Sequence, residues 1–124
     1  MKKQFAAVLA AAVAVPALVM AAAAPASAAT GARYIRYGDS GYAVKCVQWA
    51  WNDFVSSMDF PHPELALDVD GVFGDQTLAA VKQYQRTAQI SQDGVVGPVT
   101  GNYMWTNRLY RSHPECYPYV PTQV

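Results

Sequence analysis

Residue types that commonly build active sites are scarce in this chain. There are 2 His and 2 Cys residues among 124, and 15% of the residues are charged. His62 and His113 are each followed by Pro, and neither lies in a His-Glu-x-x-His pattern, which argues against a zinc hydrolase. The chain also lacks the Gly-x-Ser-x-Gly elbow of a serine hydrolase. We therefore expect no enzyme activity, no metal and no cofactor.

The sequence has no excess of positive charge either. Its 9 Lys and Arg residues balance its 9 Asp and Glu residues. Without Lys2 and Lys3, seven basic residues remain against nine acidic ones, a net charge of −2. Because binding to nucleic acid depends on basic patches that neutralise phosphates, nucleic acid is not an expected partner.

The carboxylates do not form a catalytic or calcium-binding pattern. Asp68 and Asp70 are two residues apart, so on an extended segment they point to opposite faces, which is a poor arrangement for a glycosidase pair. In a calcium loop, Ala66 would occupy the first position and Thr77 the position of the bidentate Glu. We interpret these aspartates as turn residues.

Residues 1–28 are typical of a secretory signal peptide. Residues 1–3 are positively charged, residues 5–24 are apolar and rich in Ala, and residues 26–28 form an Ala-Ser-Ala cleavage pattern. A permanent membrane anchor is the alternative, because an apolar run of this length could span a bilayer. We favour cleavage and expect a secreted protein, extracellular or associated with the cell wall, with no membrane attachment. The remainder is long enough for one small domain.

The two cysteines are expected to pair. Cys46 and Cys116 would reach an oxidising compartment, where such pairs usually form disulfides. The bond would close a loop of about 70 residues and stabilise the fold by roughly 4 kcal/mol in the chain-entropy model. It would also attach the C-terminal tail to the first helix. The alternative, a reactive thiol, would require a reduced cysteine near a histidine.

One phrase occurs twice, 23 residues apart. Residues 70–77 and residues 93–100 both read Asp-Gly-Val-x-Gly-x-x-Thr. Asp-Gly favours a tight turn, because Gly accepts positive φ and Asp can hydrogen-bond to nearby backbone N–H groups. Each copy therefore predicts a turn, a short extended step and the start of a helix. We call residues 70–77 the first turn and residues 93–100 the second turn.

The pattern of apolar residues predicts a mainly α, compact three-helix domain. Helices are expected at about residues 41–55, 75–88 and 98–109, with Asp39 or Ser40 as the N-cap of the first one. Residues 56–69 contain prolines that prevent a continuing helix. The first two helices also resemble each other around Gln48 and Gln85, which suggests two similar half-units on a shared core.

These pieces together resemble the peptidoglycan-binding-like domain family. The resemblance rests on residues 38–48, 70–85 and 93–100, which have the order and spacing of that family. It covers residues 36–104 and leaves a lead at residues 29–35 and an aromatic, Pro-rich tail at residues 105–124. The family is a small three-helix module, typically attached to bacterial cell-wall hydrolases and thought to hold them on the wall. Three departures from its pattern are Gln89, where Gly is usual, Gly101, where an apolar or aromatic residue is usual, and a connection after the first helix that is longer than usual.

The resemblance implies that the partner is peptidoglycan, through its sugar or its stem peptide. Backbone N–H groups at a helix start can bind a carboxylate, and aromatic rings such as those of Tyr34, Tyr37 and Trp51 could contact sugars. The turn residues also have a purely structural interpretation, and the two glutamines could either satisfy loop carbonyls or line a polar groove. The candidate ligand-binding residues are Tyr42, Gln48, Asp70, Phe73, Gln85 and Asp93.

Two functions are compatible with these observations. The first is a secreted, non-catalytic protein that binds peptidoglycan. The second is a secreted interaction protein that docks a protein partner, such as a cell-wall hydrolase, through its aromatic tail, since exposed Tyr and Trp are enriched at interfaces. The tail could instead fold back over the first helix and cover the core. A buried tail next to an open groove would favour the first function.

Overall fold

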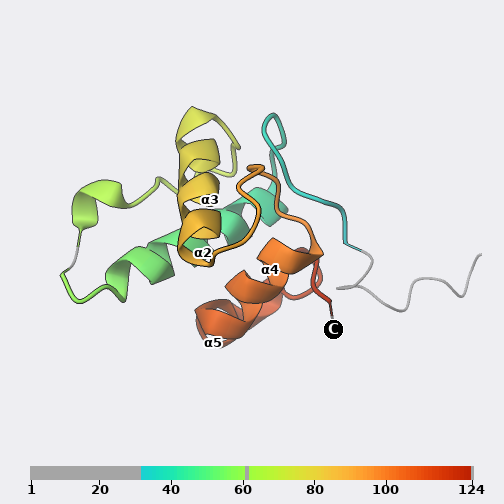
Figure 1. The fold of residues 1–124 in the computed structure, drawn as a ribbon. Helices are drawn as coiled ribbons and strands as arrows, with labels where there is room; N and C mark the ends of the chain where they lie inside the picture. The colour runs from blue at the N-terminus through green and yellow to red at the C-terminus, as the bar shows by residue number, and fades with distance from the viewer. Residues whose placement is uncertain (1–31, 61, 124) are drawn as a thin grey trace, which may run out of the picture.

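The computed structural model describes residues 32–60 and 62–123. The predicted signal peptide lies outside these residues. The described chain is a compact, mainly α domain, as predicted, and it contains no β-strand, only two isolated antiparallel bridges. Figure 1 shows α3 crossing α2, with α4 and α5 lower in the view. No helix in residues 32–60 and 62–123 is long and apolar enough to cross a membrane.

Helix α2 spans Tyr42–Ser56 and supplies the centre of the core. Its buried face includes Val44, Val47 and Val55. The predicted capping is wrong, because Gly41 is the N-cap and no side chain caps the helix. Asp39 instead accepts a hydrogen bond from the Arg36 backbone N–H, at 3.0 Å.

Helix α3 spans Asp75–Thr87, close to the predicted range. Asp75 lies in its first turn, where a carboxylate favours the positive end of the helix dipole. Two residues after the helix, Gln89 adopts φ 59°, the left-handed conformation that Gly accepts most readily. Because Gly adopts this conformation without strain, it explains why the family usually has Gly at this position.

The third helical segment is longer and less regular than predicted. It begins as α4 at Pro98–Met104, widens into the π-helical η4 at Trp105–Leu109, and ends as α5 at Tyr110–Ser112. Single π-helical turns inside α-helices frequently occur at functional sites. Here η4 packs against both α2 and α4.

The loop between α2 and α3 is anchored to α2. It contains the 3₁₀ helix η3 at Pro63–Leu65. The Trp51 indole N–H donates to the Leu65 carbonyl at 2.7 Å. Asn52 bonds to both the carbonyl and the N–H of Leu67, at 2.9 and 2.7 Å. These contacts direct the chain into the first turn.

The C-terminal tail covers part of the core. The structure contains the predicted Cys46–Cys116 disulfide, which joins α2 to the 3₁₀ helix η5 at Pro114–Cys116. Val120 is fully buried, and a Cβ added at Gly101 would lie 1.8 Å from the Pro121 carbonyl oxygen. Only Gly allows the tail to approach α4 this closely. The departure at Gly101 therefore reflects the packing of the tail.

Candidate functional site

The first turn is held by the buried amide of Gln48. The Gln48 Nε2 donates to Asp70 Oδ1, the Val72 carbonyl and Thr77 Oγ1, at 2.9, 3.2 and 3.2 Å. Its Oε1 accepts the Gly71 N–H at 3.0 Å. Gln48 is 2% exposed, so one side chain in α2 satisfies the turn and the start of α3 together.

The second turn has the same arrangement around Gln85. The Gln85 Nε2 donates to Asp93 Oδ1, the Val95 carbonyl and Thr100 Oγ1, at 2.9, 3.0 and 3.0 Å. Its Oε1 accepts the Gly94 N–H at 2.9 Å. Gln85 is 0% exposed and lies in α3. Both glutamines thus satisfy loop groups, which was one of the two interpretations left open by the sequence.

The aspartate carboxylates of the two turns also bond to groups of their own turns. Asp70 Oδ1 also accepts the Val72 N–H, and Asp93 Oδ1 accepts the Val95 N–H, both at 3.0 Å. The Val72 N–H, followed by the Gln48 amide, lowers the pKa of Asp70 below its ordinary value. These bonds give both aspartates a structural role in the turns.

The six candidate ligand-binding residues are therefore not brought together in one site. Gln48 and Gln85 are enclosed at separate turns, and Phe73 is 1% exposed in the core. Tyr42 lies elsewhere on the surface, 39% exposed, with its ring centroid 4.8 Å from that of Tyr119. Ligand binding by these residues remains a prediction, but burial leaves Gln48, Gln85 and Phe73 little surface for it.

The other aromatic candidates also lie apart. Trp51 is buried, whereas Tyr34 and Tyr37 are exposed. The Tyr34 ring lies against the backbone of Gly97, beside a hollow of about 470 Å³ at the second turn. A smaller hollow of about 350 Å³ at the first turn is bordered by Asp70 and other acidic residues.

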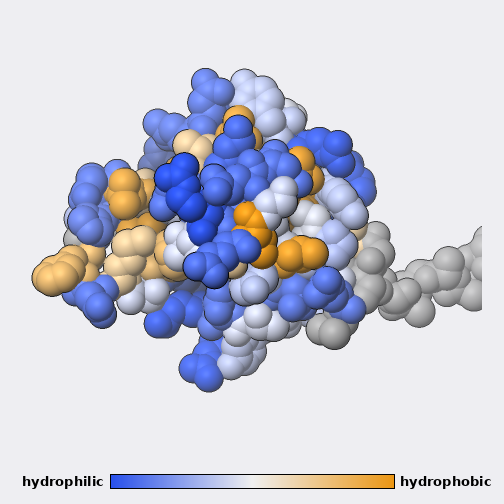
Figure 2. All heavy atoms as spheres, viewed as in Figure 1, coloured by the Kyte–Doolittle hydropathy of each residue, from blue (hydrophilic) through white to orange (hydrophobic). Residues whose placement is uncertain are grey.

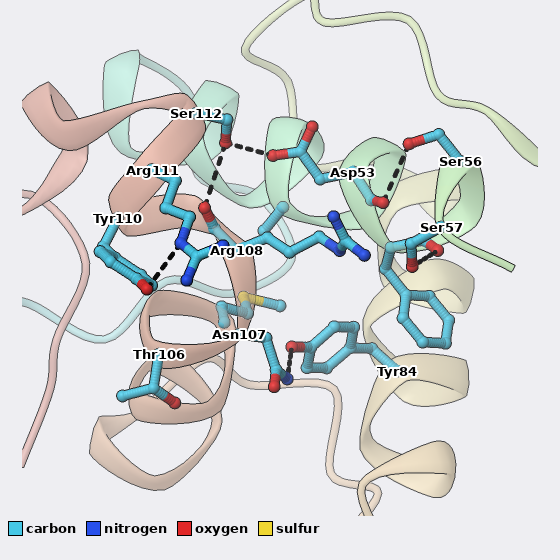
Figure 3. Close-up of a pocket in the computed structure, with 13 residues that line it drawn as sticks. Asp53, Ser56, Ser57, Tyr84, Thr106, Asn107, Arg108, Tyr110, Arg111 and Ser112 are labelled. Atoms are coloured by element: carbon cyan, nitrogen blue, oxygen red, sulfur yellow. Dashed lines mark hydrogen bonds between the residues drawn. The ribbon is translucent and has the colours of Figure 1, made fainter.

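A larger open groove of about 680 Å³ lies between α2, α3 and the η4–α5 segment. Figure 3 shows the side chains that line it. We call it the polar groove, because most of these side chains carry hydroxyl, amide or charged groups. Its lining residues are Ala50, Asp53, Phe54, Ser56, Ser57, Tyr84, Met104, Thr106, Asn107, Arg108, Tyr110, Arg111 and Ser112.

Hydrogen bonds order much of this groove. The Ser112 hydroxyl donates to Asp53 Oδ2 and so joins α5 to α2. Asn107 donates to the Tyr84 hydroxyl at 3.0 Å, and burial raises the pKa of that Tyr84 hydroxyl. Arg111 Nε donates to the Tyr110 hydroxyl at 2.7 Å. The walls are therefore linked to each other while the space between them stays open.

Arg108 differs from the other ionisable groups of the groove. In Figure 3 its side chain extends from η4 across the groove, between Asp53 and Tyr84. Within residues 32–60 and 62–123 its guanidinium makes no hydrogen bond or ion pair. It therefore presents several N–H donors to anything that enters the groove.

One face of the domain is mostly polar. The face seen in Figure 2 is mostly hydrophilic, and its hydrophobic residues form small patches. Among the described residues, no group of three or more His, Cys, Asp or Glu side chains could hold a metal ion.

Comparison with known proteins identifies the middle of the chain. The model of a family described as "Putative peptidoglycan binding domain" matches residues 57–104. The predicted family resemblance is confirmed. The matched segment contains both turns, α3 and α4.

Two curated relatives match this chain over longer stretches. A protein of Kitasatospora aureofaciens described as "Uncharacterized protein in bpoA1 3'region" is 40% identical over 74 residues, which cover 60% of this chain and 53% of that protein. The zinc D-Ala-D-Ala carboxypeptidase of Streptomyces albus G is 34% identical over 68 residues, 55% of this chain and 24% of the enzyme. The chain thus aligns with about half of one relative and a quarter of the other. No solved structure matches it significantly.

Sequence reasoning did not identify the polar groove. Several of its residues, including Asn107, Arg108 and Ser112, lie beyond residue 104, outside the region of resemblance. Asp53, Ser56 and Ser57 lie at the end of α2, where the sequence shows only an ordinary polar helix end. Two arginines within four residues of each other, Arg108 and Arg111, were the available signal.

Proposed function

We propose that this protein is a secreted, non-catalytic protein that binds peptidoglycan in the bacterial cell wall. The match of residues 57–104 to the peptidoglycan-binding family is the observation that carries the proposal. The described residues of this range, 57–60 and 62–104, run from the α2–α3 loop to the end of α4. The match to 24% of the zinc D-Ala-D-Ala carboxypeptidase of Streptomyces albus G is consistent with a binding module.

The position of the tail also supports wall binding. Val120, Pro121 and Thr122 are buried against the domain. The polar groove next to the η4–α5 segment nevertheless stays open. Burial of this end of the tail favours binding by the domain itself, whereas Tyr110, Tyr117 and Tyr119 of the same tail are exposed and leave docking of a protein partner open. A protein partner remains a prediction.

The direct test is sedimentation of the oxidised protein with purified insoluble peptidoglycan. We expect saturable retention on peptidoglycan, much weaker retention on chitin, and no release of soluble fragments. Chitin is the control because it offers an insoluble amino-sugar polymer without peptides. Absence of retention would contradict the proposal, and release of fragments would show that the protein is an enzyme.

A further inference from the structure

We propose that the polar groove recognises the free C-terminal carboxylate of the peptide part of peptidoglycan, and that Arg108 is the residue that binds it. This inference rests on the proposed function and specifies its ligand. The groove is the largest of the hollows described above, at about 680 Å³, and it is open to solvent at the surface. That volume falls within the range of sites for small ligands, about 300–1,000 Å³.

The charges of the groove favour an anion. Its three charged side chains are Asp53, Arg108 and Arg111. Asp53 accepts a hydrogen bond from the Ser112 hydroxyl. Arg111 donates a hydrogen bond to the Tyr110 hydroxyl and makes a cation–π contact with the Tyr110 ring, with its guanidinium carbon 5.2 Å from the ring centroid. Among residues 32–60 and 62–123, no carboxylate forms an ion pair with the guanidinium of Arg108. A planar guanidinium is well suited to bind a carboxylate through two parallel hydrogen bonds.

The remaining walls favour a peptide as the bearer of that carboxylate. The Ser56 and Ser57 hydroxyls donate to carbonyls within α2, at 3.0 and 2.7 Å, and keep lone pairs that can accept N–H groups of a ligand. Phe54 and Met104 provide apolar surface for small side chains. A peptide with small residues and a free terminus offers all three kinds of group, whereas a neutral sugar lacks the carboxylate.

Arg108 also lies outside the segment that defines the family. It belongs to η4, beyond the matched residues 57–104. Its position in the groove depends on the widened π-helical turn and on the Ser112–Asp53 contact that holds the segment to α2. The carboxylate specificity is therefore a property of this chain's C-terminal part.

The test measures binding of a soluble disaccharide–pentapeptide by titration calorimetry. The ligand is used with a free terminal carboxylate and as its C-terminal amide. For the wild-type protein, we expect the amide to bind about tenfold more weakly, because a charge-assisted hydrogen bond is lost. Equal affinities for acid and amide would overturn the inference, and this comparison requires no mutant to fold.

Two substitutions separate Arg108 from general charge effects. Arg108→Gln should weaken binding of the free acid about tenfold and abolish the preference for acid over amide. Arg86→Gln is the matched control, because Arg86 lies in the last turn of α3, bonds to Gln92 and does not line the groove. This variant should bind the free acid with an affinity within about twofold of the wild-type value. Thermal unfolding of each variant shows that it is folded.

The outcomes distinguish this inference from the proposed function. If wild-type protein sediments with peptidoglycan while Arg108→Gln keeps full affinity and acid preference, the inference is wrong and wall binding stands. If wild-type protein does not sediment, wall binding itself is contradicted. If Arg108→Gln weakens binding of the free acid and Arg86→Gln does not, the result supports the assignment of Arg108 as the carboxylate-binding residue.

Discussion

The two turns and the polar groove are built from similar polar groups but use them differently. In the turns, the amides of Gln48 and Gln85 are buried and bonded to loop groups of the same chain. In the groove, hydroxyls and the Arg108 guanidinium face an open space. A buried polar group that is fully satisfied specifies a fold, whereas an exposed and unpaired one is available to a ligand. Changes in the turns should therefore alter stability, and changes in the groove should alter binding.

The disulfide should show the largest effect on stability. It links α2 to the C-terminal segment across 70 residues of sequence. Replacing both cysteines, Cys46→Ala with Cys116→Ala, should lower the free energy of unfolding by about 4 kcal/mol in the chain-entropy model. Urea unfolding of the variant and the oxidised wild type measures this difference. A loss below about 1 kcal/mol would show that the tail is held in place by packing instead.

Removal of a turn glutamine should have the next largest effect. Gln85→Ala deletes three donor contacts and leaves the buried Gly94 N–H without its acceptor. We expect a loss of about 3 kcal/mol, since each buried unsatisfied group costs about 1–3 kcal/mol. Gln83→Ala, at an exposed position of the same helix, is the control and should change stability by less than about 0.5 kcal/mol. Similar values for both variants would contradict the structural role of Gln85.

The carboxylate of the first turn should make stability depend on pH to a smaller extent. The pKa of Asp70 is lowered in the folded state, mainly by the Val72 N–H, from an ordinary value of 3.8. The charged form therefore stabilises the fold above pH 3.8, and this contribution is lost as the pH falls below 3.8 through the lowered folded value.

Thermal unfolding of wild type and Asp70→Asn between pH 5 and pH 2 tests this expectation. The wild type should be more stable at pH 5, and the two midpoints should converge as the pH falls. A constant gap across this range would mean that the ionisation of Asp70 does not contribute.

The smallest expected effect is a gain in stability when Gln89 is replaced by Gly. Its φ of 59° strains a side chain with a Cβ, at a cost of about 1–2 kcal/mol, and Gly would remove this cost. Greater freedom of Gly in the unfolded chain offsets part of the gain, so Gln89→Gly should stabilise by about 0.5 kcal/mol. Equilibrium unfolding measures this change in the free energy of unfolding. The affinity for the peptide ligand should stay unchanged. Destabilisation would show that the Gln89 side chain has a role of its own.

Much of the fold follows from local sequence signals. Apolar spacing, the Asp-Gly turns and Pro98 locate the starts of α3 and α4, and the cysteine count predicts the disulfide. The capping of α2 was wrong because the backbone of Asp39 pairs with that of Phe73, with Phe73 N–H donating to the Asp39 carbonyl at 2.9 Å. Such a pairing between distant segments leaves no local signal at either residue.

The groove depends still more on distant contacts. The bond from Ser112 to Asp53 joins residues 59 apart in the sequence, and the open space around Arg108 is bordered by residues of α2 and α3. Gly101 illustrates the same limit. In the sequence it weakens a helix, and in the structure it admits the Pro121 backbone.

The most direct test of the division between fold and binding is an amide NMR titration of the isotopically labelled, oxidised protein with the disaccharide–pentapeptide. The account predicts shift changes concentrated at residues 53–57 and 106–112, around the polar groove, with the Gly71 and Gly94 amides unaffected because they are bonded to buried glutamines. Shift changes centred on residues 70–77 or 93–100 would place the binding site at the turns and contradict the account.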